Sequence, residues 1–244
     1  CYYTRFPSVL IKPLSHLSTK QKTLFVFYSI TFIINLLIKI NKKIMSNIIK
    51  DLNLVFSTPI WTFIVDDYKS INSNILKYIK NLQKEDSIGV KKSNNSGWHS
   101  KSFDMENENV KIFFTTIQKY INKTIGDSGW NNSSNEFNVT SAWSIINFKN
   151  SSNSRHIHSN NYLSAAYYVK ASKNCGDIIF YDPRNSRVIR KPTTNSGNFL
   201  NAELINITPQ EGLLVLFPSY LHHSVKENLS DDERIVISFN LDTK

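Results

Sequence analysis

Two segments of the chain repeat apolar residues at the spacing of an amphipathic helix. In the first segment, which Asp66 or Asp67 precedes as a candidate cap, the apolar residues are Ile71, Ile75, Leu76, Ile79 and Leu82. In the second segment, which Gly126 follows as a candidate stop, they are Val110, Phe113, Phe114, Ile117, Tyr120, Ile121 and Ile125. Each segment is therefore predicted to form a helix that buries one broad apolar face.

Short apolar runs of strand length dominate the rest of the domain. One such run covers residues 57–65, with Pro59 near its start, where a missing N–H is tolerated at a sheet edge. The other runs lie at residues 137–148, 162–169, 177–181, 186–190, 212–217, 224–227 and 234–241. The polar segment Lys84–Ser102 is predicted to be a loop with an ordered contact at Trp98. Many strands after two helices predict a mainly β domain with flanking helices (α+β), arranged as a sandwich or jelly roll.

The first 44 residues differ from the rest of the chain. They begin with Cys1, and their apolar run Leu24–Ile38 has lysines on both sides. The run is slightly shorter than the roughly 20 residues that a membrane span requires. Two interpretations stay open, a signal-anchor helix and an upstream sequence that precedes a true start at Met45; we favour the second. The predicted organisation is a leader at residues 1–44 and a single domain at residues 45–244.

The charge of the chain lies mainly in that leader. The net charge is +10, but residues 1–44 hold seven of the 29 basic residues and no acidic one, so the domain carries 22 basic and 19 acidic residues. This near balance argues against a nucleic-acid partner. Two cysteines cannot build a disulfide framework, which favours a reducing compartment and a cytoplasmic location.

A pair of histidines is the strongest chemical signal in the sequence. In Arg155-His156-Ile157-His158, an extended backbone would place both imidazoles on one face. Two imidazoles on one face can bind one metal ion. The remaining candidates for a third nitrogen in a similar setting are His222 and His223, which follow the apolar run Gly212–Pro218.

The order of several short motifs resembles an iron(II)- and 2-oxoglutarate-dependent oxygenase family that is common in marine microbes and their phages. The motifs are Phe56-Ser-Thr-Pro-Ile-Trp61, Ser96-Gly-Trp-His-Ser100, His156-x-His158, Tyr162–Val169, Cys175–Arg184, Glu211–Ser219, His223-Ser-Val225, Glu233-Arg-Ile235 and Ser238-Phe-Asn240. The resemblance covers about residues 54–241. It implies a double-stranded β-helix, which is a cupin-like jelly roll closed around a metal.

The resemblance also implies roles for particular residues. The family usually binds iron with two histidines and a carboxylate, and His158 stands where the carboxylate would be, so the implied ligands of Fe(II) are His156, His158 and His223. Asn160 and His222 remain alternatives. Arg234 is implied to bind the far carboxylate of 2-oxoglutarate, because a guanidinium grips a carboxylate with two parallel hydrogen bonds. The hydroxyl that the family supplies two residues later is replaced by Val236, so Tyr168, Tyr167 or Ser238 would have to supply it.

The activity that follows is that of a dioxygenase, an oxidoreductase that uses Fe(II) and 2-oxoglutarate, hydroxylates a substrate and releases succinate and CO₂. The substrate would be a small molecule or a peptide, with no nucleic acid, and with no membrane unless residues 1–44 are an anchor. The candidates for its pocket are Trp98, Trp143, Arg184 and Tyr220. Two other functions remain open, a cupin-like three-histidine dioxygenase that does not use 2-oxoglutarate and a non-catalytic jelly-roll binding module.

Overall fold

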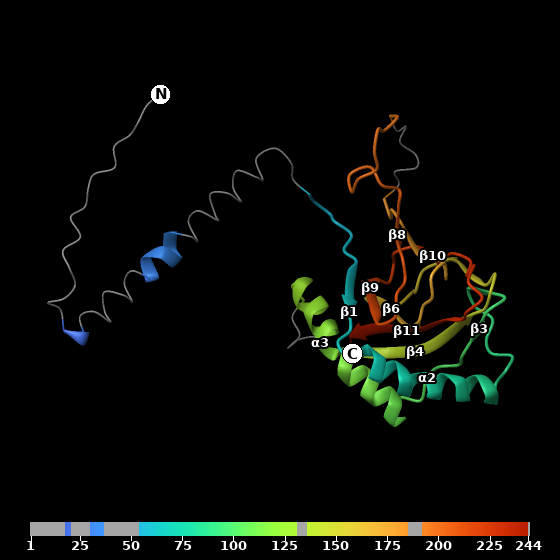
Figure 1. The fold of residues 1–244 in the computed structure, drawn as a ribbon. Coiled ribbons are helices and arrows are strands. Elements are labelled where there is room, and N and C mark those ends of the chain that lie inside the picture. Colours follow the sequence, from blue (N-terminus) through green and yellow to red (C-terminus); the bar gives the residue numbers. More distant parts are fainter. Residues whose placement is uncertain (1–17, 21–29, 37–53, 131–135, 185–191, 244) are drawn as a thin grey trace. The chain divides into compact units, whose positions relative to one another are not determined.

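The computed structural model describes residues 18–20, 30–36, 54–130, 136–184 and 192–243 (Figure 1). The chain divides into two compact units, Cys1–Ser57 and Thr58–Lys244, and the second contains all the strands and helices discussed below. Of the predicted apolar run Leu24–Ile38, only residues 30–36 are described, and they are helical. Met45 lies outside the described residues. No helix within the described ranges has both the length and the hydropathy that a membrane span needs.

Two antiparallel sheets form the second unit. The six-stranded sheet has the order β1-β9-β6-β11-β4-β3, and the five-stranded sheet has the order β2-β5-β10-β7-β8. The strands of the first are β1 (Trp61–Ile64), β9 (Leu213–Pro218), β6 (Leu163–Lys170), β11 (Arg234–Thr243), β4 (Phe137–Asn147) and β3 (Trp98–His99). Those of the second are β2 (Asn94–Asn95), β5 (Ser152–His156), β10 (His223–Val225), β7 (Ile178–Tyr181) and β8 (Leu204–Ile207). The non-sequential strand order confirms the predicted mainly β, jelly-roll class.

Two helices cover one face of the six-stranded sheet (Figure 1). They are α2 (Tyr68–Glu85) and α3 (Glu108–Asp127), and both were predicted. Their ends differ from the prediction. Asp67 precedes α2, but its side chain makes no capping hydrogen bond, whereas Asn107 caps α3 by accepting from the N–H of Asn109. Gly126 lies inside α3, and Gly129, with φ of +69°, is the first residue after the helix with a left-handed backbone.

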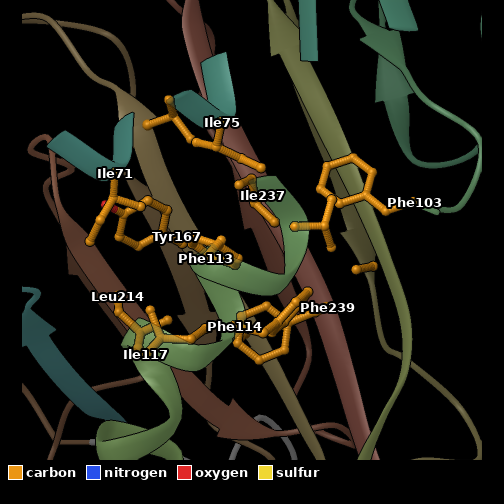
Figure 2. Packing of buried hydrophobic residues seen from close by; sticks show 14 of the residues in the cluster. Ile71, Ile75, Phe103, Phe113, Phe114, Ile117, Tyr167, Leu214, Ile237 and Phe239 are labelled. Atoms are coloured by element: carbon orange, nitrogen blue, oxygen red, sulfur yellow. The ribbon is translucent and has the colours of Figure 1, made fainter. Parts of the chain in front are cut away.

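The helices and the six-stranded sheet bury the larger of two hydrophobic cores. Figure 2 shows Ile71 and Ile75 of α2, and Phe113, Phe114 and Ile117 of α3, packed against side chains from the strands. Phe114 meets Phe239 of β11 edge to face, with ring centroids 5.3 Å apart. Such aromatic contacts add to the stabilisation from buried area. This core holds the six-stranded sheet in place on its helix-covered face.

The opposite face of that sheet forms the inside of the jelly roll. Along β11, Ile235, Ile237, Phe239 and Leu241 belong to the helix-facing core. The alternate residues of β11 line a cavity between the sheets, and they are Arg234, Val236, Ser238 and Asn240. Both faces of β11 are buried. A strand buried on both faces is usually apolar throughout, so the polar residues on the cavity side of β11 are unusual.

The predicted run at residues 186–190 lies outside the described residues and stays a prediction. Other features of the strand prediction need correction. The segment Lys84–Ser102, predicted to be a loop, contains the short strands β2 and β3, and β8 was not predicted. Strand β5 ends at His156, so His158 lies beyond it, and simple strand alternation does not explain why the two imidazoles meet.

Candidate active site

Three histidines from two distant segments of the chain meet inside the jelly roll. The candidate ligand atoms of His156, His158 and His223 all lie within 4.8 Å of one another. His156 and His223 are paired Cα neighbours on β5 and β10, and their ring centroids are 4.3 Å apart. His158 joins them from the segment after β5, where its backbone N–H donates to the carbonyl of Ser219.

Each imidazole presents the same nitrogen to this cluster. The Nδ1 atoms of His156 and His223 contact the backbone carbonyls of Ser154 and Leu221, at 2.7 and 3.0 Å. The Nδ1 atom of His158 contacts the side-chain oxygen of Asn240 at 2.6 Å. Carbonyl and amide oxygens only accept hydrogen bonds, so each Nδ1 carries the proton and each Nε2 keeps a free lone pair. This is the arrangement that a metal-binding histidine needs.

Burial keeps the three imidazoles neutral. It lowers the pKa of His158 to about 4 and that of His223 to about 3, and it also lowers the pKa of His156. At neutral pH none of the three carries a proton on the ligand nitrogen. The alternatives from the sequence are not in the cluster: His222 is exposed, and Asn160 is an exposed turn residue with φ of 61°.

Arg234 lines the same cavity, which has a volume of about 1120 Å³. Its side chain is fully buried, and its Nη1 donates to the carbonyls of Cys175, Gly176 and Lys226. The Nε and Nη2 atoms are buried with no hydrogen-bond partner. The nearby acidic residues do not neutralise it, because Asp231 and Asp232 pair with Lys149 and Lys170. A buried guanidinium with two free donors is matched to an anion, most simply a carboxylate.

The buried position of the Arg234 side chain requires a glycine at residue 176. Its φ is +88°, and a Cβ at this position would lie 2.5 Å from the carbonyl oxygen of Lys226 and 2.7 Å from Nη1 of Arg234. Only glycine leaves room for the carbonyls to surround the guanidinium. The sequence shows this glycine within Cys175-Gly176-Asp177, but the pattern alone gave no reason to connect it to Arg234.

Two of the three hydroxyls that were predicted to bind the far carboxylate of 2-oxoglutarate are on the cavity wall. Tyr168, on β6, and Ser238, on β11, line the cavity and are almost fully buried. Burial raises the pKa of Tyr168, so its phenol stays protonated and can donate a hydrogen bond. Tyr167, the alternative, points to the helix side, where its hydroxyl donates to Asn72.

Of the four residues predicted to form the substrate pocket, only Trp143 lines the cavity. Trp143 lines the cavity, and its ring lies 5.5 Å from that of His158. Trp98 is buried elsewhere, and its indole N–H donates to the carbonyl of Asp86. Arg184 is exposed and bound to Asp182 at 2.8 Å, and Tyr220 is 58% exposed. Trp98, Arg184 and Tyr220 do not line this cavity.

Two cavity residues were missed as parts of the site. His99 lies within the segment Lys84–Ser102 that was predicted to be a loop, but it is buried on β3, and its ring stacks on that of Trp143 with centroids 5.7 Å apart. Asn240 was noted only as part of a motif, and the contact with His158 could not be seen from sequence because the two residues are far apart in the chain. A buried polar residue in an apolar strand is the signal that could have found Asn240.

Comparisons with known proteins bear on the family and on the fold. Residues 141–240 match the model of a family described as "Putative 2OG-Fe(II) oxygenase". A search of curated proteins finds no match.

Solved structures share the fold at low sequence identity. A prolyl-4-hydroxylase from Pseudomonas putida has a TM-score of 0.55 and 11% identity, covering 77% of this chain and 94% of that chain. A prolyl hydroxylase from Trichoplax adhaerens, in complex with a hypoxia inducible factor peptide fragment, has a TM-score of 0.53 and 13% identity, with 76% and 84% covered. HygX from Streptomyces hygroscopicus, with nickel, 2-oxoglutarate and hygromycin B bound, has a TM-score of 0.52 and 10% identity, with 76% and 83% covered.

The fold is a jelly roll, and its cavity holds a three-histidine cluster that could bind a metal ion. Residues 141–240, which include all three histidines and Arg234, match the model of the 2OG-Fe(II) oxygenase family. These findings support an oxidoreductase that uses Fe(II) and 2-oxoglutarate.

Proposed function

We propose that His156, His158 and His223 bind one Fe(II) ion through their Nε2 atoms, and that Arg234 binds the far carboxylate of 2-oxoglutarate. The observation that supports this most is the unpaired guanidinium of Arg234 in the cavity that also holds the three-histidine cluster. A buried cation with two unused donors is costly unless a ligand completes it. The far carboxylate of 2-oxoglutarate has the charge and the planar shape to do so.

The ligand set suits the cosubstrate. Three neutral imidazoles do not reduce the dipositive charge of Fe(II), whereas a carboxylate ligand would, and 2-oxoglutarate arrives as a dianion. Tyr168 and Ser238 offer hydroxyls along the wall that leads to Arg234. We assign them to hydrogen bonds with the cosubstrate carboxylate, in place of the hydroxyl that Val236 lacks.

Fe(II) and 2-oxoglutarate together supply O₂ activation: one oxygen atom enters succinate as CO₂ is released, and the other enters the substrate as a hydroxyl group. The residues of the chain provide the setting. Phe217 packs against the His223 ring at a centroid distance of 4.7 Å and keeps water from that side of the cluster. Trp143 and His99 form the wall next to His158 where a substrate would lie.

The substrate belongs to the small molecules or peptides rather than the nucleic acids. A cavity of about 1120 Å³ has room for such a ligand beside the cosubstrate. The structural neighbours include one with a peptide fragment and one with hygromycin B. The near balance of charge in residues 45–244 does not favour nucleic acid. The buried free thiol of Cys175 fits a reducing, cytoplasmic location.

Anaerobic titration tests the proposal. The purified protein, first with Fe(II) and then with 2-oxoglutarate, should develop a visible charge-transfer band and should form succinate when O₂ is admitted. The His156→Ala variant should show neither. If the wild-type protein binds Fe(II) but gives no band and no succinate, the 2-oxoglutarate site does not exist.

The three-imidazole set also favours a second function, because such a set can support a cupin-like dioxygenase that acts directly on its substrate. That enzyme would need no anion at Arg234. It would consume O₂ in the presence of its substrate without forming succinate, so the succinate assay separates the two functions.

A further inference from the structure

The three histidines are oriented by two different devices. His156 and His223 lie on paired strands, and the acceptor for each Nδ1 is a backbone carbonyl two residues earlier in the chain. No substitution can remove those carbonyls. His158 lies after the end of β5 and has no such local acceptor; its Nδ1 is held by the side chain of Asn240, 82 residues later in the chain.

Asn240 is itself held in one orientation. Its Nδ2 donates to the hydroxyl of Ser141 at 3.1 Å, and its Oδ1 accepts from the hydroxyl of Ser164 at 2.8 Å. Ser141 and Ser164 are the Cα partners of Asn240 on the two neighbouring strands, β4 and β6. The amide is therefore braced from both sides, with its oxygen toward His158.

The bracing extends to the backbone of His158. The hydroxyls of Ser164 and Ser219 are 2.8 Å apart, and the carbonyl of Ser219 accepts from the N–H of His158. Because Ser164 uses its proton on Asn240, it must accept the proton of Ser219. One connected network of buried polar groups thus fixes both the position of His158 and the proton on its ring.

We infer that Asn240 is a positioning residue that makes His158 a metal ligand. With the amide oxygen facing Nδ1, the proton of the imidazole stays on Nδ1 and Nε2 is free to bind. Without that acceptor, the ring is free to rotate and to carry its proton on Nε2, where it blocks the metal. Asn240 thus orients the ring of His158, as the backbone carbonyls of Ser154 and Leu221 orient the rings of His156 and His223. This inference rests on the proposed metal site.

Two substitutions of nearly equal size separate this role from packing. Asn240→Leu keeps the branched shape and the number of heavy atoms and removes the acceptor, and it should raise the dissociation constant for Fe(II) or Co(II) by about 10- to 100-fold, as loss of outer-shell partners does at other metal sites. Asn240→Asp keeps an acceptor oxygen, and it should bind these ions as tightly as the wild type or more tightly. Asn161→Leu, at a half-buried asparagine that also lines the cavity but accepts from Thr140 instead of a histidine, is the matched control and should bind these ions normally.

The titrations should follow Co(II) absorption under anaerobic conditions, with circular dichroism and thermal unfolding to confirm that each variant is folded. Normal metal affinity in Asn240→Leu would overturn the inference. Equal losses in Asn240→Leu and Asn240→Asp would overturn it too, because they would show that Asn240 acts through packing alone.

A second measurement separates this inference from the proposed function. In the metal-free wild-type protein, ¹⁵N chemical shifts of the imidazoles should place the proton of His158 on Nδ1, and Asn240→Leu should populate both tautomers. If the wild-type protein binds no metal while His158 still shows this dependence on Asn240, the proposed function fails and the network stands. If His158 keeps the Nδ1 proton in Asn240→Leu, the network does not control it.

Discussion

His156 and His223 are directly paired across the antiparallel strands β5 and β10, with ring centroids 4.3 Å apart. Neighbouring strands in an antiparallel pair bring side chains on the same face close together regardless of their separation in sequence. The pairing therefore sets the distance between two candidate ligands by backbone hydrogen bonds rather than by loop conformation. A site built in this way is rigid before any metal binds.

Loss of His223 should remove metal binding, whereas loss of its neighbour should not. Loss of an outer-shell partner alone weakens metal binding by about 10- to 100-fold, so His223→Ala, which removes a ligand, should weaken it by more than about 100-fold. His222→Ala is a matched control because His222 is adjacent in sequence but exposed. Calorimetric titration with Co(II) measures both. The opposite ranking would place His222 at the metal.

Arg234→Ala should separate the cosubstrate from the metal. Among the described residues that line the cavity, Arg234 carries the only fully buried guanidinium. Its loss should lower the affinity for 2-oxoglutarate by about 100-fold or more, as expected for a lost pair of hydrogen bonds to a charged group. Fe(II) affinity should stay within a few-fold of wild type. Arg184→Ala, at an exposed arginine bound to Asp182, is the control and should bind 2-oxoglutarate normally. Unchanged 2-oxoglutarate affinity in Arg234→Ala would refute the assigned role.

Gly176→Ala should displace the side chain of Arg234 and leave the three histidines in place. The new Cβ would lie 2.5 Å from the carbonyl of Lys226, at a residue whose φ is +88°. We expect a loss of about 1–3 kcal/mol in the free energy of unfolding and a weaker affinity for 2-oxoglutarate, with metal affinity kept. Gly126→Ala, inside α3 with nothing near the added methyl group, should leave stability equal or slightly higher. Urea unfolding and 2-oxoglutarate titration are the measurements, and equal stability of the two variants would contradict the strained geometry.

The metal-free protein should lose stability as the pH falls below 6.5. Burial holds the pKa of His158 at about 4 and that of His223 at about 3 in the folded protein, whereas both regain values near 6.5 on unfolding. Below pH 6.5 the unfolded chain therefore binds more protons, and the free energy of unfolding falls by at most about 1.4 kcal/mol per pH unit for each histidine. The loss continues until the pH passes the folded pKa.

Urea unfolding at pH 7, 6 and 5 with a chelator present should show this slope. The His223→Gln variant should have a shallower slope, and His222→Gln, at an exposed position, should match the wild type. Most carboxylates are still ionised in this range, so the histidines dominate the change. A slope that is the same in all three proteins would mean that His223 is not buried as a neutral ring.

Much of this protein could be predicted from local patterns. Apolar periodicity located both helices and most of the strands, because burial of one face imposes a fixed repeat on the sequence. The run from Arg234 to Leu241 was placed on a strand for this reason, and the His-x-His pair marked the candidate metal site. The ends of α3 and the short strands β2, β3 and β8 were missed, since capping and tertiary pairing set them rather than periodicity.

The sequence by itself determined the class of fold and the residue types of the site, because hydrophobic spacing and the imidazole side chain carry that information locally. The tertiary structure decided which of His222 and His223 faces the cluster, why Arg234 keeps two donors unpaired, and that Asn240 reaches His158. These relationships depend on the register of β4, β6 and β11 and on a chain segment that leaves β5 after His156. Contacts between residues so far apart in the chain arise only when strands pair, and a one-residue change of register would turn each of these side chains to the other face of its sheet.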